Sequence, residues 1–377
     1  MDLAQLETPC LILDKGKLEK NIKKMRDHLA RLKVPLRLHV KTAKCIEAVR
    51  PVLQGRDKSI TVSTLKEAEY FFSHGITDIL YAVGIAPIKL EHIARLKHKG
   101  ADIKIILDSV EQAQAVALAG QKLGVTFPAL IEIDSDNHRA GVRPDDPLLI
   151  EIGRLLQHEK GVELKGVMTH AGASYECKNT AAIHKVAAQE RDAAIVCAGR
   201  LQKAGLPCPI VSVGSTPTAW FVEDYSGVTE VRAGVFLFQD LVLAGLNVCK
   251  VEEIAISVLA AVIGHQKQKG WVLTDAGWMA LSRDRSTSQQ TIDQGYGLVC
   301  ALDGKPLNDF IVNATNQEHG IIVKRDDSAL VFKDFPIGSL VRVLPNHACA
   351  TAAMFDKYYV VDDTTEIIDS WQRINGW

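Results

Sequence analysis

The segment "SITVSTLKEAEYFFSHGITDILYAV" (residues 59–83) contains two short apolar runs separated by an amphipathic stretch. The runs at 59–64 and 78–83 are rich in β-branched and aliphatic residues, as is typical of buried strands. Thr64 and Glu67 have capping-box spacing at the start of the stretch between them, which indicates a helix. The segment therefore predicts a βαβ unit, the repeating unit of a parallel sheet.

The same alternation extends in both directions along the chain. A further helix is predicted to begin at Asp108, with Glu111 in capping-box spacing, and to end at Gly124. Eight strands alternating with helices predict an α/β protein with a parallel (β/α)₈ TIM barrel, with an open doubly wound sheet as the alternative. The eight runs lie at 36–41, 59–64, 78–83, 103–108, 128–134, 163–170, 209–214 and 228–234.

The sequence changes character after Gly245. Short β-rich runs separated by turns replace the alternation, and they predict a second, all-β domain. A chain of 377 residues is long enough for two domains, which we place at 11–245 and 246–377. The β-rich runs lie at 252–266, 269–278, 320–325, 338–345 and 357–363.

Composition argues against several classes of protein. Apolar residues make up 47% of the chain and charged residues 24%, which is typical of a globular protein. The formal net charge of -1 gives no electrostatic attraction for nucleic acid or an anionic membrane. The first residues carry acids and no apolar stretch of signal-peptide length. Eight cysteines without a C-x-x-C pair fit a reducing compartment, so we expect a cytoplasmic protein. We expect neither nucleic acid nor a membrane as its partner.

Polar residues gather where the predicted barrel strands end, which is where barrels of this kind carry their chemistry. Lys41 ends the first strand, Arg139 follows the fifth, and "GSTPT" (214–218) follows the seventh. Each has a simple structural alternative: a solvated strand end, a surface ion pair and an ordinary turn. Together, an amine for a Schiff base, a cation and a loop of small hydroxyl residues predict a pocket for pyridoxal 5′-phosphate.

Ten motifs, spread over nearly the whole chain, carry a family resemblance. They are "TPCLILD", "LRLHVKTAK", "ITVSTLKEAEYFFSHGITDILYAV", "EIDSDNHRAGV", "THAGASYE", "VSVGSTPT", "EVRAGVF", "DAGWMALSRDR", "NQEHG" and "PNHACAT". In this order they resemble the D-serine dehydratase and D-threonine aldolase family of pyridoxal-phosphate enzymes, which share the alanine racemase-like fold (fold type III). The resemblance implies a barrel followed by a β-domain that the N-terminal residues 1–10 join.

The resemblance also implies roles for individual residues. Lys41 matches the lysine that holds the cofactor, and Arg139 matches an arginine that hydrogen-bonds near the pyridoxal 3′-oxygen. Phe236 stands where close relatives have a tyrosine, so a phosphate contact from that hydroxyl is absent. The matched cofactor-binding positions, including the phosphate loop at 214–216, are Lys41, Arg139, Tyr175, Gly214, Ser215, Thr216 and Gly234.

The motif "PNHACAT" (345–351) contains a histidine and a cysteine one residue apart. Spacing alone makes His347 and Cys349 a weak metal site, with a buried cysteine beside a hydrogen-bonded histidine as the alternative. The resemblance implies that this pair binds a divalent metal, as in the family's dehydratases, whereas its aldolases carry an aspartate at the cysteine's position. Thiolate and imidazole favour Zn²⁺, with Mn²⁺, Co²⁺ or Ni²⁺ as alternatives.

The function that the resemblance implies is dehydration. The substrate would be a small-molecule D-β-hydroxy amino acid, D-threo-3-hydroxyaspartate or D-serine, and the products a 2-oxo acid and ammonia. Retro-aldol cleavage, racemisation and a non-catalytic pyridoxal-phosphate carrier remain alternatives. His170, Gln317 and His319 are further candidates for supporting roles. Family members pair head to tail, so we also expect a homodimer with shared active sites.

Overall fold

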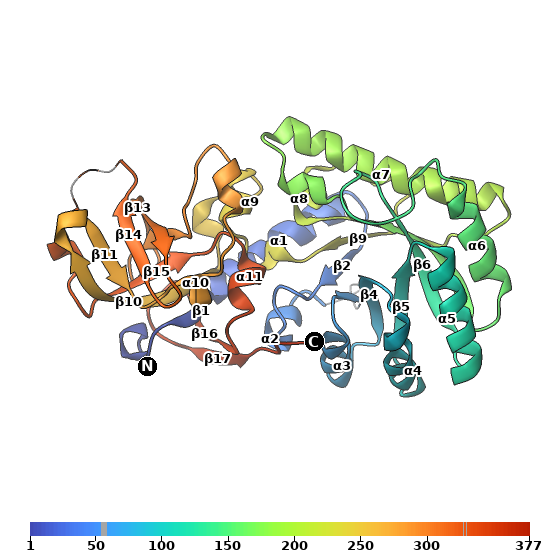
Figure 1. Ribbon diagram of the computed structural model, residues 1–377, viewed down its shortest axis with the longest axis horizontal. Coiled ribbons are helices and arrows are strands. Elements are labelled where there is room, and N and C mark those ends of the chain that lie inside the picture. The colour runs from blue at the N-terminus through green and yellow to red at the C-terminus, as the bar shows by residue number, and fades with distance from the viewer. Residues whose placement is uncertain (54–58, 327, 329) are drawn as a thin grey trace. The chain divides into compact units, whose positions relative to one another are not determined.

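The computed structural model describes residues 1–53, 59–326, 328 and 330–377. Contacts between residues divide the chain into two compact units (Figure 1). The barrel unit consists of Met25–Lys41, Val49–Gly234 and Gly376–Trp377. The β-rich unit consists of Met1–Lys24, Thr42–Ala48 and Val235–Asn375.

Eight parallel strands close into a barrel in the barrel unit. β2 pairs with β3 at Leu38 and Ile60 and with β9 at Leu36 and Val231, which closes the ring. Each strand overlaps a predicted run, so the predicted (β/α)₈ barrel is confirmed. The strands are β2 (Leu36–His39), β3 (Ile60–Val62), β4 (Asp78–Gly84), β5 (Asp102–Leu107), β6 (Phe127–Ile133), β7 (Val162–Thr169), β8 (Ile210–Val213) and β9 (Glu230–Ala233).

Helices alternate with these strands. α5 begins one residue later than predicted, because Ser109 is its N-cap and accepts a hydrogen bond from the Gln112 N–H. Asp108 instead accepts the Gly141 N–H at 2.9 Å. Gly124 ends the helix in the left-handed conformation, as predicted. The first eight helices in chain order are α1 (Lys15–Arg31), α2 (Ile46–Val49), α3 (Leu65–Ser73), α4 (Leu90–His98), α5 (Val110–Leu123), α6 (Leu148–His158), α7 (Thr180–Lys203) and α8 (Thr216–Phe221). No helix within the described ranges is long and apolar enough to cross a membrane.

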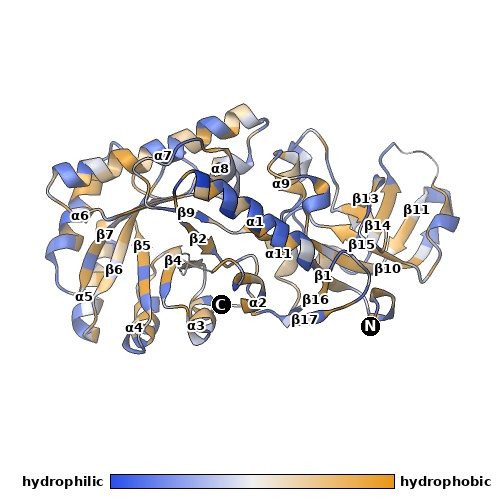
Figure 2. Ribbon diagram, turned by 180° about the vertical axis from the view of Figure 1, so that it is seen from behind, coloured by the Kyte–Doolittle hydropathy of each residue, from blue (hydrophilic) through white to orange (hydrophobic). Residues whose placement is uncertain are grey.

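Alternate residues of the barrel strands face the interior. The barrel strands are largely hydrophobic, and hydrophilic residues are frequent in the helices around them (Figure 2). Strand register places Arg37 beside Arg232 and Glu230 beside Ser212 on the inward face. The apolar part of the interior is a cluster of Leu80, Ile106, Leu130 and Met168.

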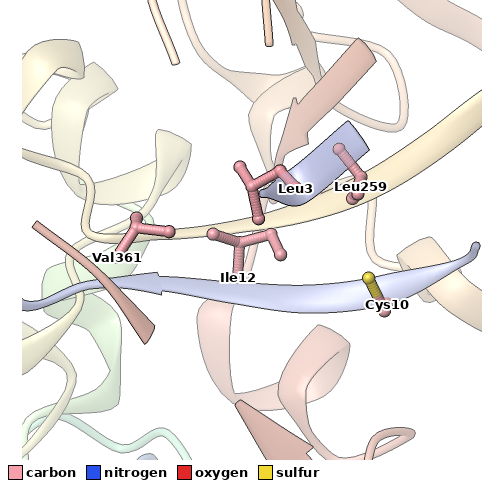
Figure 3. Packing of buried hydrophobic residues seen from close by; sticks show 5 residues of the cluster. All are labelled: Leu3, Cys10, Ile12, Leu259 and Val361. Atoms are coloured by element: carbon pink, nitrogen blue, oxygen red, sulfur yellow. The ribbon is translucent and has the colours of Figure 1, made fainter. Parts of the chain in front are cut away.

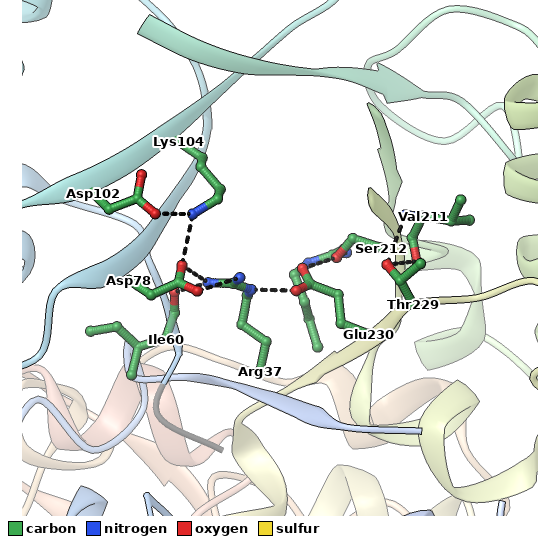
Figure 4. Close-up of polar contacts among 10 residues, drawn as sticks. Arg37, Ile60, Asp78, Asp102, Lys104, Val211, Ser212, Thr229 and Glu230 are labelled. Carbon is green, nitrogen blue, oxygen red and sulfur yellow. Dashed lines mark hydrogen bonds and ion pairs between the residues drawn. The ribbon is translucent and has the colours of Figure 1, made fainter. Parts of the chain in front are cut away.

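An ion-pair network occupies the barrel interior near the first residues of its strands (Figure 4). The Arg37 guanidinium lies 2.8 Å from both Asp78 and Glu230. Lys104 Nζ lies 3.0 Å from Asp78 and 2.7 Å from Asp102. Because Asp78, Asp102 and Glu230 open their strands, the network fills the end of the barrel opposite the strands' C-terminal ends, where such barrels carry their active sites.

The β-rich unit is built on one nine-stranded sheet. β1 (Cys10–Asp14) lies between β10 and β16, so the N-terminal segment is an inner strand of this sheet. A buried cluster of Leu3, Cys10, Ile12, Leu259 and Val361 packs against it (Figure 3). Four strands of this sheet, β1, β12, β13 and β17, were not predicted from the sequence. The other strands are β10 (Ile256–Gln266), β11 (Trp271–Thr274), β12 (Leu298–Cys300), β13 (Pro306–Thr315), β14 (Gly320–Lys324), β15 (Leu340–Leu344), β16 (Lys357–Val361) and β17 (Asp369–Gln372), with helices α9 (Leu241–Gly245), α10 (Trp278–Leu281) and α11 (Ala348–Ala352).

Candidate active site

Lys41 follows β2 at the C-terminal end of the barrel, and its side chain is exposed. Its backbone N–H donates to His39 Nδ1 at 3.4 Å. Burial, followed by the positive charges of Lys41 and Arg232, holds the pKa of His39 well below its usual value. The barrel therefore presents an exposed amine beside a neutral imidazole.

Arg139 lies on the loop that follows β6. Asp134 Oδ1 accepts the Asn137 N–H at 2.7 Å, and Gly141 (φ +116°) lies so close to the strand end that a Cβ would approach the Asp134 nitrogen to 2.5 Å. These contacts fold the loop back over the strand. The Arg139 side chain is 61% exposed and pairs with Glu132 at 3.7 Å. Burial raises the pKa of Glu132, and Arg139 opposes that rise.

The loops after β7 and β8 form one hydrogen-bonded structure. Ser215 Oγ lies 2.9 Å from Ser174 Oγ and 3.0 Å from Thr218 Oγ1, and the Ser215 N–H donates to Thr218 Oγ1. Burial lowers the pKa of His170 to about 3, so the neutral ring donates through Nδ1 to the Gly214 carbonyl oxygen at 3.0 Å. The polar groups of Ser215 thus shape the loop on which the sequence analysis placed the phosphate.

Two glycines let the ends of neighbouring barrel strands approach closely. A Cβ on Gly214 (φ +130°) would lie 2.3 Å from the Arg232 carbonyl oxygen. A Cβ on Gly234 would lie 2.3 Å from the His39 carbonyl oxygen. No other residue fits these positions without moving a strand. The two predicted cofactor-loop glycines are therefore required by the barrel itself.

Arg232 is a buried cation to which the sequence analysis assigned no role. It lies on β9, is 3% exposed, and donates to Ser212 Oγ at 2.8 Å and to the Thr169 carbonyl oxygen. Burial lowers its pKa, while Glu190 is the foremost opposing charge. A charge inside a run such as "EVRAG" was the available signal, because strands of parallel sheets are usually apolar throughout.

These groups suit pyridoxal 5′-phosphate, an anionic aromatic aldehyde. Lys41 offers an amine, Arg139 and Arg232 offer cations, and the 214–216 loop offers small residues. All lie at the C-terminal ends of the barrel strands. The individual roles drawn from the resemblance stay predictions.

The remaining positions named from the sequence are Tyr175, Phe236, Gln317 and His319. Tyr175 is half-buried at the end of the 3₁₀ helix η3 (Gly172–Tyr175) after β7. Phe236 is fully buried in the β-rich unit. Gln317 and His319 are exposed on the turn between β13 and β14.

The structure brings the two predicted metal ligands together at the start of α11 in the β-rich unit. His347 is the N-cap residue, and its imidazole hydrogen-bonds to the Cys349 side chain. His347 Nδ1 lies 3.0 Å from Asp284 Oδ2. Cys349 Sγ lies 3.1 Å from Thr42 Oγ1. Burial lowers the pKa of His347, but the contacts with Asp284 and Cys349 outweigh it and raise that pKa.

Asp284 is a residue of this candidate site that the sequence analysis missed. Oδ2 faces His347, and Oδ1 accepts the Ser286 N–H at 2.8 Å, so both carboxylate oxygens are engaged. Burial raises its pKa, but hydrogen bonds from His347 and Ser286 lower it to about 2. A carboxylate on one imidazole nitrogen orients the ring and leaves the other nitrogen for a metal. Its signal was its place in the motif "SRDR" (282–285), which begins four residues beyond the predicted run at 269–278.

Two buried residues fix the turn that carries the pair. Asp240 Oδ2 accepts the Ala348 N–H at 3.0 Å, and Asn346 Nδ2 donates to the Asp284 carbonyl oxygen at 2.9 Å. Among the residues that the structure describes, no group of three or more His, Cys, Asp or Glu could hold a metal. Imidazole and thiol thus offer two protein ligands, one fewer than in a typical catalytic zinc site, so water or substrate would have to supply the others.

Two family models match the chain. One is the alanine racemase N-terminal domain, over residues 13–241, and the other is a putative serine dehydratase domain, over residues 255–361. The chain is 48% identical to D-threo-3-hydroxyaspartate dehydratase of Delftia sp. (strain HT23), over 100% of this chain and 99% of that protein. It is 30% identical to D-serine dehydratase of Dictyostelium discoideum, over 100% and 98% of the two chains.

Solved structures give the same likeness. The Delftia dehydratase superposes with a TM-score of 0.97 over 100% of both chains. D-threonine aldolase from Filomicrobium marinum has a TM-score of 0.83 at 26% identity, over 99% of this chain and 96% of that chain. A D-threo-3-hydroxyaspartate dehydratase has also been solved as a histidine-to-alanine variant and as a cysteine-to-alanine variant in a metal-free form.

Proposed function

The chain belongs to the D-serine dehydratase and D-threonine aldolase family, and from that premise we propose that it is a pyridoxal 5′-phosphate-dependent dehydratase. It converts a D-β-hydroxy amino acid into a 2-oxo acid and ammonia, and is therefore a lyase. The observation that carries this proposal is the 48% identity, over the whole chain, to a D-threo-3-hydroxyaspartate dehydratase. D-threo-3-hydroxyaspartate and D-serine are the proposed substrates.

Lys41 is the proposed catalytic base. When bound, the cofactor supplies an electron sink that makes the α-proton of the substrate acidic. Lys41 would hold the cofactor through its amine and, once that amine is free, would accept the α-proton of the substrate at Nζ. His39 and His170 do not compete for this proton, because burial holds the pKa of each below its usual value.

Arg139 is proposed to hydrogen-bond beside the 3′-oxygen of the cofactor, from the loop that returns over β6. Its guanidinium is exposed and only loosely paired with Glu132, at 3.7 Å. The side chain can therefore turn toward a ligand with the loss of this one long contact. Tyr175 and the 214–216 loop complete the proposed cofactor contacts.

His347 and Cys349 are proposed to bind a divalent metal. The metal-free form of a cysteine variant of a D-threo-3-hydroxyaspartate dehydratase supports a metal in this family. Imidazole with thiolate favours Zn²⁺, although Mn²⁺, Co²⁺ or Ni²⁺ are alternatives. When bound, the metal would polarise the β-carbon–oxygen bond, which assists the departure of a hydroxyl group that otherwise leaves poorly.

Cys349 favours elimination over retro-aldol cleavage. Cleavage needs a base that takes the proton of the β-hydroxyl group, and a carboxylate at the metal would supply one. This chain has a thiol at that position. Asp284 does not replace the missing carboxylate, because both of its oxygens are engaged by His347 and Ser286.

The compartment proposed for the enzyme is the cytoplasm. All eight cysteines are free thiols, and five of them are buried. Free thiols persist in reducing compartments, where structural disulfides are rare.

A product assay tests the proposed reaction. The purified protein, supplied with cofactor and Zn²⁺, is incubated separately with D-threo-3-hydroxyaspartate, D-serine and D-threonine. We expect 2-oxo acid and ammonia in equal amounts from at least one of the first two. Glycine and an aldehyde from D-threonine, with no oxo acid from the others, would show instead that the chain is an aldolase.

A further inference from the structure

Glu190 is a buried carboxylate with no role in the proposed chemistry. It lies on α7, which packs against the outside of β7 and β8, and it is 2% exposed. A charged group so far from water is stable only where several donors surround it. The hydrogen-bond donors around Glu190 therefore indicate its structural role.

Three donors from two different loops meet at this carboxylate. The Ala171 N–H, in the loop after β7, donates to Oε1 at 2.7 Å. The Gly214 N–H and the Thr218 hydroxyl, both from the segment after β8, also hydrogen-bond to Glu190. One side chain thus links the loops at 170–175 and 214–218 from behind.

These hydrogen bonds fix the conformation of the 214–216 loop. Gly214 is held on both sides, since its N–H bonds to Glu190 and its carbonyl oxygen accepts from His170. Thr218 Oγ1 also accepts the Ser215 N–H at 2.9 Å, so the contact with Glu190 continues into Ser215. The N–H groups of Gly214 and Ser215 are thus hydrogen-bonded within the protein.

Electrostatics shows that the role is geometric. Burial raises the pKa of Glu190, and the hydrogen bonds from Thr218 and Ala171 and the charge of Arg232 oppose that rise. An ionised carboxylate behind a phosphate-binding loop would repel the phosphate. Glu190 therefore does not attract the phosphate through its charge. Its contribution to the site is its three hydrogen bonds.

We propose that Glu190 is the positioning residue of the cofactor phosphate loop: it locks the loops after β7 and β8 into the shape that binds the phosphate of pyridoxal 5′-phosphate. This inference rests on the proposed function, which places the phosphate at residues 214–216. It adds a residue from a covering helix, 24 positions before Gly214, to the cofactor site.

Cofactor binding to the full-length apoprotein tests the inference. Dissociation constants are measured by absorbance for pyridoxal 5′-phosphate and for pyridoxal, which lacks the phosphate. Glu190→Asp keeps the charge but falls short of the loops, and Glu190→Gln keeps the length but offers one acceptor oxygen fewer. We expect each to weaken pyridoxal 5′-phosphate by about tenfold or more, the loss typical of a broken buried hydrogen bond to a charged group, with little change for pyridoxal.

Two further variants complete the design. Asp78→Asn, a matched change at the other end of the barrel, should leave the ratio of the two dissociation constants as in the wild type. Thr218→Val removes the hydroxyl that links Glu190 to Ser215 with little change of shape, and it should reproduce the selective loss even where the Glu190 variants fail to fold.

The binding results distinguish a failure of the role of Glu190 from a failure of the proposed function. Equal weakening of both ligands, or none, in the Glu190 and Thr218 variants would overturn the role of Glu190 while leaving the proposed function intact. Tighter binding of pyridoxal 5′-phosphate by Glu190→Gln with no change in Glu190→Asp would also overturn it, since the charge alone would then matter. A wild-type apoprotein that binds neither ligand would refute the proposed function and this inference with it.

Discussion

Lys41 is the residue on which the proposed chemistry depends, and it can be tested directly. We expect the purified protein to be yellow and borohydride to attach the cofactor permanently to the peptide that contains Lys41. Lys41→Ala should lose the colour and at least about 10³-fold in turnover, because both the covalent link and the base are gone. Lys44→Ala is the control and should keep both. A label on Lys44, or full turnover in Lys41→Ala, would contradict the assignment.

Asp284 makes a second test at the scale of single residues. Asp284→Asn should weaken Zn²⁺ binding by about 10- to 100-fold, because the ring of His347 loses the carboxylate that orients it. The measurement is competition with a chromogenic chelator. Asp303→Asn, in the same unit but paired only with Lys305, serves as the control.

Chelation gives the matching test on the wild type. Removing the metal should abolish turnover and leave the cofactor absorbance unchanged, because the two proposed sites use separate ligands. A metal-free preparation with full activity would rule out the metal's role.

At the scale of whole elements, two glycines in helices make opposite predictions. Gly120 in α5 lies against the backbone of Gly161, with which a Cβ would collide. Gly199 in α7 has open space around it. Gly120→Ala should therefore destabilise the barrel by about 1–3 kcal/mol, the usual cost of overpacking.

Gly199→Ala is the counterpart and should stabilise the barrel by about 0.5–1 kcal/mol, because alanine loses less backbone entropy in a helix. Thermal unfolding midpoints followed by circular dichroism would move down for the first variant and up for the second. Equal shifts in one direction would mean that the contact with Gly161 does not control the packing of α5.

At the scale of the molecule, we propose a homodimer with shared active sites. The β-rich unit exposes apolar side chains, among them Ile263, Val331 and Ile337, which association would shield from water. We expect light scattering after size exclusion to give twice the chain mass of 41.3 kDa. A fully active species at the mass of one chain would contradict the proposal.

Local patterns in the sequence were sufficient to predict the barrel. Each of its eight strands overlaps a run recognised from its own residues, and Lys41 and the 214–216 loop follow strand ends as predicted. Hydrophobic periodicity and turn residues act over a few positions, so they are readable without knowledge of the partner strands. The same locality limits them: β13 ("PLNDFIVNAT") has no clear alternation, and its pairing with β12 and β14 includes register shifts.

Only the tertiary structure decided which groups surround each buried charged side chain. Arg232, Glu190 and Asp284 look alike in the sequence, as single charges in mixed segments, and any of them could have been a surface residue. The fold places Arg232 inside the barrel, Glu190 behind two loops and Asp284 against His347. The sequence by itself determined the barrel strands and the positions of Lys41 and the 214–216 loop after strand ends. The contacts that set the ionisation and orientation of Glu190 and His347 come from groups 19 and 63 positions away, which only closure of the chain brings into contact.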